Sequence, residues 1–183
     1  MVNVHPPRAD TDCPDADRAR FRVLLTEDRT HSSAHWSRQL PRLMRPLGVE
    51  AVVAAHAQQA LDALDDGPLD AAVVDLATPR APGKPSPADD PGGLYLLNAL
   101  ARHRRKPPVI VVDSRVVTPA QVHRALQQAL RLGAFSVLRR PVELEQLLVA
   151  IQRLIDRHFQ GHWPGGQPSS SNFQPPFSQE QQQ

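Results

Sequence analysis

The feature that most constrains the fold is an alternation of short apolar runs with longer segments of helical spacing. The apolar runs are uniformly apolar, which is typical of parallel strands covered on both faces. They lie at 21–26, 49–55, 69–75, 107–113 and within 134–141. Helices are predicted at 31–48, 58–66, 92–105, 118–133 and 142–159. Five strands alternating with five helices predict a doubly wound α/β domain.

Prolines and glycines refine these predicted boundaries. Pro41 and Pro46 fall within the first helix and must kink or divide it, because each removes a backbone donor. Pro119 occupies a tolerated first-turn position of the fourth helix, and Gly133 is expected to be its C-cap.

Composition sets the domain limits and the cellular context. The 183 residues suffice for one domain, predicted at 21–159, with polar segments at 1–20 and 160–183 that we expect to be disordered. Aromatic residues make up only 4% of the chain, so the core must be aliphatic. A single cysteine, Cys13, excludes an internal disulfide. No apolar run reaches the roughly 18 residues of a membrane span, and no secretory signal begins the chain, so a cytoplasmic location is expected.

Carboxylates gather where the predicted strands end. Glu27 and Asp28 follow the first strand, Asp75 ends the third and Asp113 ends the fourth. Ligands of doubly wound sheets bind at the carboxyl ends of the strands. If the first and third strands are neighbours, Glu27, Asp28 and Asp75 converge, and their mutual repulsion favours a divalent cation. Magnesium suits such oxygen ligands best.

Simpler explanations compete with this one. An Asp at a strand end often only caps the following turn or helix, and for Asp113 that interpretation is preferred. The chain has no GxxxxGK[ST] or GxGxxG motif, which argues against a P-loop NTPase or a dinucleotide-binding enzyme. The net charge of +2 does not indicate a nucleic-acid partner.

Four segments together resemble a bacterial response-regulator receiver domain. They are "RVLLTEDR", "DAAVVDLATP", "PPVIVVDS" and "GAFSVLRRPVELEQLL", and the last is similar to receivers of the NtrC-like group. The likeness covers about residues 21–158. It implies a flavodoxin-like, five-stranded parallel sheet of order 2-1-3-4-5 with five helices.

The resemblance also implies a role for each matching residue. Asp75 matches the aspartate that accepts a phosphoryl group from a histidine kinase or phosphotransfer protein. Glu27 and Asp28 match the acidic pair that binds Mg²⁺ together with that aspartate. Arg140 stands where the family has a lysine. A receiver signals through a downstream effector protein and is not usually classed as an enzyme.

Three departures from the family pattern bear on function. Asp113 replaces a Thr or Ser, Arg140 is bulkier than the family lysine, and Val137 replaces an aromatic switch residue. The loop after Asp75 is also longer than usual. Two functions therefore stay open. The preferred one is a stand-alone receiver phosphorylated on Asp75, with no helix-turn-helix after residue 159 and no direct contact with nucleic acid or membrane. The other is a pseudo-receiver that binds proteins without phosphotransfer. A homodimer through the last two helices is left open.

Overall fold

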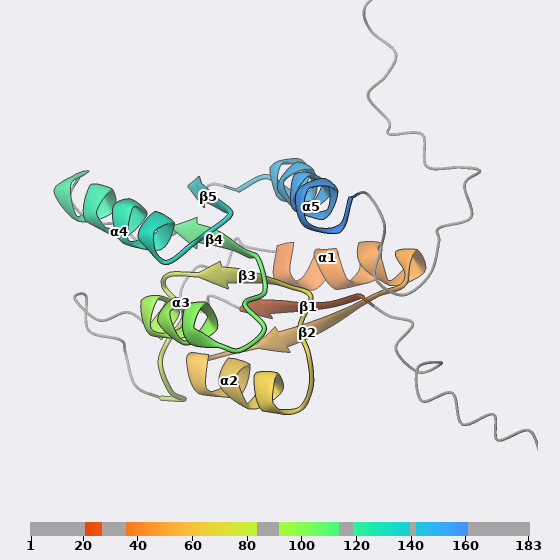
Figure 1. Cartoon of the computed structure of the whole chain (residues 1–183), viewed down its shortest axis with the longest axis horizontal. Coiled ribbons are helices and arrows are strands. Elements are labelled where there is room, and N and C mark those ends of the chain that lie inside the picture. The colour runs from red at the N-terminus through yellow and green to blue at the C-terminus, as the bar shows by residue number, and fades with distance from the viewer. Residues whose placement is uncertain (1–20, 27–35, 84–91, 114–118, 140–141, 161–183) are drawn as a thin grey trace, which may run out of the picture.

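A five-stranded parallel sheet forms the centre of the protein in the computed structural model, which describes residues 21–26, 36–83, 92–113, 119–139 and 142–160 (Figure 1). The strand order is β2-β1-β3-β4-β5, so the order that the resemblance implies is confirmed. All four strand pairs are parallel. The strands are β1 (Phe21–Thr26), β2 (Val49–Ala54), β3 (Ala71–Asp75), β4 (Val109–Asp113) and β5 (Ser136–Arg139).

Helices cover both faces of this sheet. Helices α1 and α5 pack on one face, and α2, α3 and α4 pack on the other (Figure 1). Their bounds are α1 (Trp36–Met44), α2 (Ala57–Asp65), α3 (Gly92–Arg102), α4 (Pro119–Arg131) and α5 (Leu144–Phe159). The predicted doubly wound architecture is confirmed.

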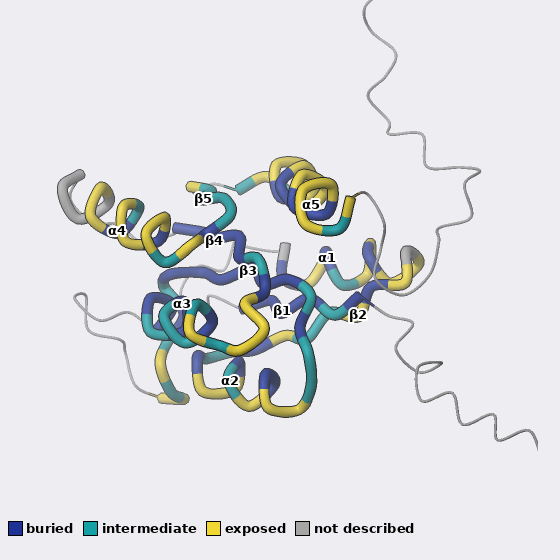
Figure 2. Tube along the Cα trace, viewed as in Figure 1, coloured by how far each residue is buried: buried dark blue, intermediate teal, exposed yellow. Residues whose placement is uncertain are grey.

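The core consists of two aliphatic layers separated by the sheet. Along β3, Val73 packs toward α1 and α5, whereas Val74 packs toward α2, α3 and α4. Such alternation follows from the two-residue period of a strand. Both β3 and β4 are buried along their whole length, whereas β5 at the edge is partly exposed (Figure 2). This double coverage explains why the strands read as continuous apolar runs.

The two prolines of the first predicted helix act differently. Pro41 lies inside α1 and does not divide it. The helix ends at Met44, and a 3₁₀ turn over Arg45–Leu47 carries Pro46 before Gly48 takes a left-handed conformation (φ 78°). The division predicted at Pro46 is therefore confirmed, whereas Pro41 does not divide the helix and a kink there stays a prediction. Residues 31–35 lie outside the described part of the chain.

Gly133 ends α4 as predicted. Its φ is 85°, and the N–H groups of Gly133 and Ala134 donate to the carbonyls of Leu130 and Ala129. This pair of bonds is a Schellman motif, which satisfies helix carbonyls that would otherwise lack partners. Of the segments predicted to be disordered, 1–20 and 160–183, all but Gln160 lie outside the described residues, and Gln160 is the C-cap of α5. Among the described helices, none combines the length and apolar character that crossing a membrane requires.

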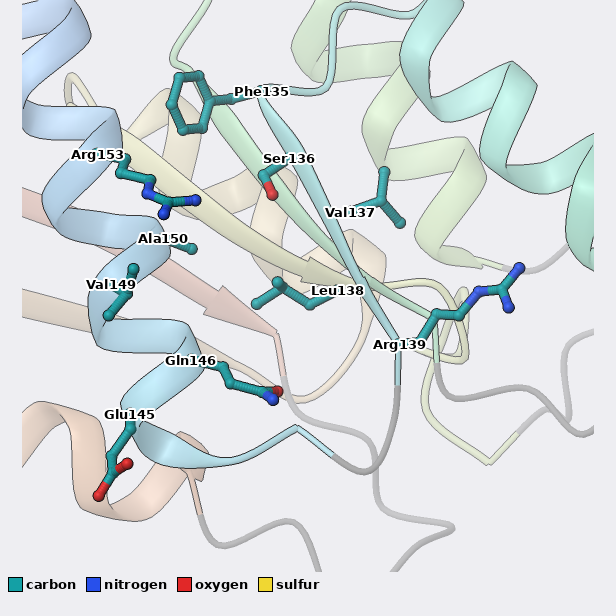
Figure 3. Close-up of a pocket in the computed structure, with 10 residues that line it drawn as sticks. All are labelled: Phe135, Ser136, Val137, Leu138, Arg139, Glu145, Gln146, Val149, Ala150 and Arg153. Carbon is teal, nitrogen blue, oxygen red and sulfur yellow. The ribbon is translucent and has the colours of Figure 1, made fainter.

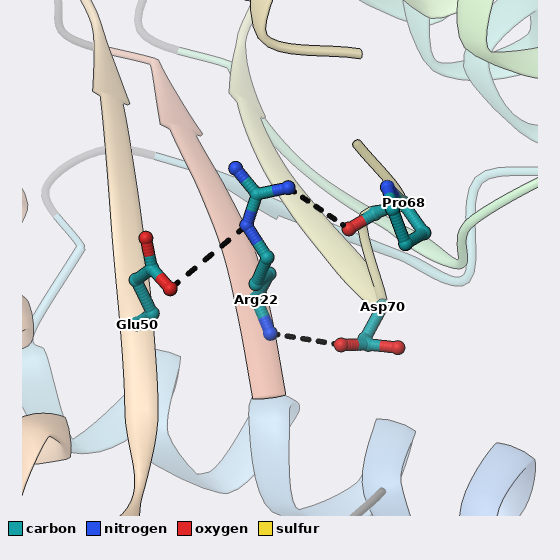
Figure 4. A network of polar contacts seen from close by, with 4 residues as sticks. All are labelled: Arg22, Glu50, Pro68 and Asp70. Atoms are coloured by element: carbon teal, nitrogen blue, oxygen red, sulfur yellow. Dashed lines mark hydrogen bonds and ion pairs between the residues drawn. The ribbon is translucent and has the colours of Figure 1, made fainter. Parts of the chain in front are cut away.

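A polar cluster around Arg22 joins three strands at the opposite end of the sheet from Asp75 (Figure 4). The Arg22 N–H donates to Asp70 Oδ2 (2.8 Å), and Arg22 Nη1 donates to the Pro68 carbonyl (3.4 Å). Glu50 on β2 lies 4.0 Å from Arg22 Nε. The cluster connects β1 to β2 and to the segment that enters β3.

Candidate functional site

Asp75 ends the central strand of the sheet and is fully buried, with 0% of its surface exposed. Its backbone is paired with Val112 on β4, and β1 lies on its other side. The prediction that Asp75 lies at the carboxyl end of a buried strand is therefore confirmed. A carboxylate at this depth needs polar partners, because burial of an unpartnered charge is costly.

Hydrogen bonds hold both the backbone and the side chain of Asp75. Its N–H donates to Thr26 Oγ1 on β1 (2.7 Å), and its Oδ1 accepts from the Ala77 N–H (2.8 Å). Its carbonyl accepts from the Thr78 N–H (3.1 Å). The bond to Ala77 makes an Asx turn. The capping role considered from the sequence is thus real for one carboxylate oxygen.

The segment after this turn is fastened to two helices. The carbonyls of Pro79 and Arg80 accept the first two N–H groups of α2, from Ala57 (2.8 Å) and Gln58 (3.2 Å). Helix N-termini leave such donors without intrahelical partners. The Arg80 guanidinium lies 4.0 Å from the ring centroid of Tyr95 on α3, a cation–π contact. The turn that follows Asp75 therefore connects β3 to both α2 and α3.

Two glycines let α3 approach the backbone at the end of β3. A Cβ on Gly93 would lie 2.5 Å from Leu76 Cα and would also meet the Asp75 carbonyl oxygen. A Cβ on Gly92 would lie 2.5 Å from the Arg80 nitrogen and 2.6 Å from the Thr78 carbonyl oxygen. Since the obstacles are main-chain atoms, this close approach requires glycine at both positions.

Asp113 ends β4 and is 6% exposed. It is paired in register with Arg139 on β5, and paired residues of neighbouring strands share a face of the sheet. Arg139, which lies at the end of the fifth predicted strand, is thus the residue of β5 placed directly beside Asp113. Val137, at the predicted switch position, packs against the core on the α2–α4 face.

Several predicted site residues lie outside the described part of the chain. These are Glu27, Asp28 and Arg140, together with residues 84–91 of the long loop. No group of three His, Cys, Asp or Glu side chains suited to a metal occurs among the residues that are described. The predicted magnesium site therefore rests on Asp75 and on the sequence position of Glu27 and Asp28 directly after Thr26.

Sequence reasoning missed the two threonines beside Asp75. Thr26 and Thr78 are both fully buried, and their hydroxyl oxygens lie 2.9 Å apart. A signal was present, because Thr26 is a hydroxyl residue at the end of the otherwise apolar run "VLLT". Its partner Thr78 lies 52 residues away in the sequence. The contact between them could be recognised only once β1 and β3 were known to be neighbours.

An open groove of about 530 Å³ lies away from Asp75, between β5 and the first half of α5 (Figure 3). Leu138, Gln146 and Val149 contribute to its walls, whereas the Arg139 side chain points away from α5. None of Thr26, Asp75 and Thr78 lines this groove, so it is separate from the candidate site.

No protein-family model matches the chain. It is similar to the transcriptional regulatory protein CpxR of Escherichia coli K12, with 29% identity over 153 residues. These residues are 84% of this chain and 55% of CpxR, so the chain spans about half the length of the curated relative it matches.

Two solved structures of response-regulator proteins are similar to this chain in fold. The CheY-like receiver domain protein of Methanospirillum hungatei superposes with a TM-score of 0.58 over 77% of this chain and 98% of that one, at 21% identity. A Burkholderia pseudomallei response regulator, solved with a phosphorylated aspartic acid, a calcium ion and citrate, gives a TM-score of 0.53 at 22% identity, over 76% of this chain and 70% of that one.

This chain has the receiver-domain fold. The resemblance found in the sequence is thereby confirmed, while the narrower likeness to the NtrC-like group stays a prediction. Within the receiver fold, Asp75 holds the end of the central strand, which is the position that the resemblance assigns to the phosphoacceptor.

Proposed function

We propose that this chain is the receiver domain of a two-component response regulator and that it accepts a phosphoryl group on Asp75. The observation that supports this most strongly is the place of Asp75 at the carboxyl end of β3, the central strand of a receiver fold. In the reaction, an Asp75 carboxylate oxygen forms a bond to phosphorus as the bond between phosphorus and the donor breaks. The donor keeps the electron pair of that bond. A sensor histidine kinase or a phosphotransfer protein is the proposed donor.

The three carboxylates proposed as metal ligands are chemically suited to magnesium. The carboxylates of Glu27, Asp28 and Asp75 would hold Mg²⁺, which prefers oxygen ligands and keeps several waters. When bound, the ion would offset the negative charge of the incoming phosphoryl group. The bond from the Asp75 N–H to Thr26 supports this assignment, because Thr26 directly precedes Glu27 and Asp28 in the chain.

A second function, that of a pseudo-receiver, is favoured by one observation. Asp75 has no exposed surface, and its Oδ1 is held by the Ala77 N–H in a turn. A donor must displace whatever covers the carboxylate before it can react. If that displacement does not occur, the domain acts as a protein-binding module independent of phosphotransfer.

Intact mass measured after incubation with acetyl phosphate distinguishes the two functions. We expect a single phosphoryl adduct on the wild type that requires Mg²⁺ and is absent from Asp75→Asn. The matched control is Asp62→Asn, which changes an exposed carboxylate on α2 and should keep the adduct. Lack of an adduct on wild type that is folded by circular dichroism would refute the receiver function and leave the pseudo-receiver.

A further inference from the structure

Thr26 and Thr78 bring two hydroxyl groups into a buried region beside Asp75. Thr26 ends β1 and Thr78 lies three residues after Asp75, and neither has exposed surface. A buried hydroxyl is costly unless it is hydrogen-bonded. Here the two oxygens lie 2.9 Å apart, and Thr26 Oγ1 also accepts the Asp75 N–H at 2.7 Å. Hydrogen bonds therefore compensate the burial of both hydroxyls, and one of these bonds is to the backbone N–H of Asp75.

These bonds join β1 to β3 beyond the paired part of the two strands. The register of β1 with β3 runs to Leu25 and Val73. The side-chain oxygen of Thr26 then takes the N–H of Asp75, where a backbone carbonyl would serve within a regular ladder. The direction in which the Asp75 carboxylate leaves the strand thus depends on a side chain of β1.

Thr78 closes the same turn from the other side. Its N–H donates to the Asp75 carbonyl, and its hydroxyl contacts Thr26. The next two residues, Pro79 and Arg80, are fixed by the N-terminus of α2. The turn is thus fixed at α2, and the Thr26–Thr78 contact binds its Thr78 end to β1. Loss of that contact frees Thr78 from β1, while Thr26 still accepts the Asp75 N–H and α2 still holds the far end of the turn.

We propose that Thr26 and Thr78 are positioning residues for phosphoryl transfer at Asp75. This inference rests on the proposed function. Neither hydroxyl is assigned a contact with phosphorus. Both act through the backbone of Asp75, which sets the line along which the carboxylate oxygen meets its donor. Attack on phosphorus needs that alignment, and a displacement of about 1 Å can slow such a reaction about 100-fold.

Matched variants separate the hydroxyl from the shape of the side chain. Thr26→Val keeps the shape and removes the hydroxyl, whereas Thr26→Ser keeps the hydroxyl and removes a methyl group. The rate of adduct formation is measured against acetyl phosphate concentration at fixed Mg²⁺. We expect Thr26→Val to lower the maximal rate about tenfold or more, with the half-saturating donor concentration unchanged within about twofold. Thr26→Ser should recover most of the rate.

Thr78→Val gives a second, independent test. It should slow transfer less than Thr26→Val, because Thr26 still accepts the Asp75 N–H. The double valine variant should be no slower than Thr26→Val alone, since the two hydroxyls act as one unit. A maximal rate of folded Thr26→Val within twofold of wild type would overturn the proposal. So would Thr26→Ser being as slow as Thr26→Val.

Hydrogen exchange at the Asp75 amide tests the role of Thr26 separately from the proposed function. The amide should exchange faster in Thr26→Val than in wild type or Thr26→Ser, and this measurement needs no phosphoryl donor. If wild type forms no adduct, the proposed function fails and takes the catalytic part of this inference with it. Faster exchange would then still show that Thr26 holds the Asp75 backbone, and unchanged exchange would refute that as well.

Discussion

Gly93→Ala tests whether the end of β3 depends on the close approach of α3. The added Cβ would lie 2.5 Å from Leu76 Cα and 2.9 Å from the Leu76 carbonyl carbon. Carbon atoms in contact are normally about 3.5–4.0 Å apart, so the backbone of α3 or β3 must move by about 1 Å. Overpacking of this kind costs about 1–3 kcal/mol, and the gain from alanine in a helix is at most about 1 kcal/mol. We expect the free energy of unfolding to fall by about 1–2 kcal/mol.

Urea unfolding followed by circular dichroism measures this change. For a slope of about 1–3 kcal/mol per molar urea, the midpoint should fall by about 1 M. The matched control is Gly67→Ala, whose Cβ would meet the end of the flexible Arg22 side chain instead of backbone. That variant should stay within about 0.5 kcal/mol of wild type. If Gly93→Ala proved as stable as wild type, the argument from main-chain contact would be wrong.

Three further substitutions test other parts of the fold by the same unfolding assay. His56 Nδ1 accepts the Gln59 N–H at the start of α2, so His56→Ala should cost about 1 kcal/mol while His56→Asn keeps the cap; equal losses would argue against capping. Glu50 is half exposed and 4.0 Å from Arg22, so Glu50→Gln should change stability by under about 0.5 kcal/mol. A larger loss would make that ion pair structural. Leu154→Ala removes a fully buried side chain of α5 and should cost about 3 kcal/mol, whereas a loss below about 1 kcal/mol would contradict the packing of α5 on the sheet.

The fold could be predicted because each strand of a doubly covered sheet must be apolar along its length. The run at 21–26 matches β1 in full, and the run at 49–55 matches β2 to within one residue. Helix ends were harder to predict. His56 is not among the residues that commonly cap helices, and its cap on α2 appears only once the side chain is seen to accept from Gln59.

The candidate site was predictable only in part. The place of Asp75 follows from one strand and its end, which are local features of the sequence. Its hydrogen bond to Thr26 joins residues 49 positions apart, and such a contact depends on the register of two strands. Glu27, Asp28 and Arg140 lie outside the described residues, so their proposed roles still rest on the sequence.

Asp113, which stands where the family has Thr or Ser, is interpreted differently once the pairing of β4 with β5 is known. The sequence suggested that this carboxylate replaces a hydroxyl that would face the phosphoryl group. The structure pairs Asp113 with Arg139, which supplies a positive charge on the same face of the sheet. The hydroxyls near Asp75 come instead from Thr26 and Thr78, on its β1 side.

Those hydroxyls cannot replace the missing switch residue, because Thr26 binds the backbone of Asp75. On the proposed function, the positioning of Asp75 and the response to its phosphorylation are therefore separate. The first depends on the bonds from β1, and the second lacks the Thr or Ser and the aromatic residue that the resemblance leads one to expect on β4 and β5. On the proposed function, Asp75 would accept a phosphoryl group without the β4–β5 switch. The segment from Thr78 to Arg80 links Asp75 to α2 by hydrogen bonds and to α3 by the contact between Arg80 and Tyr95.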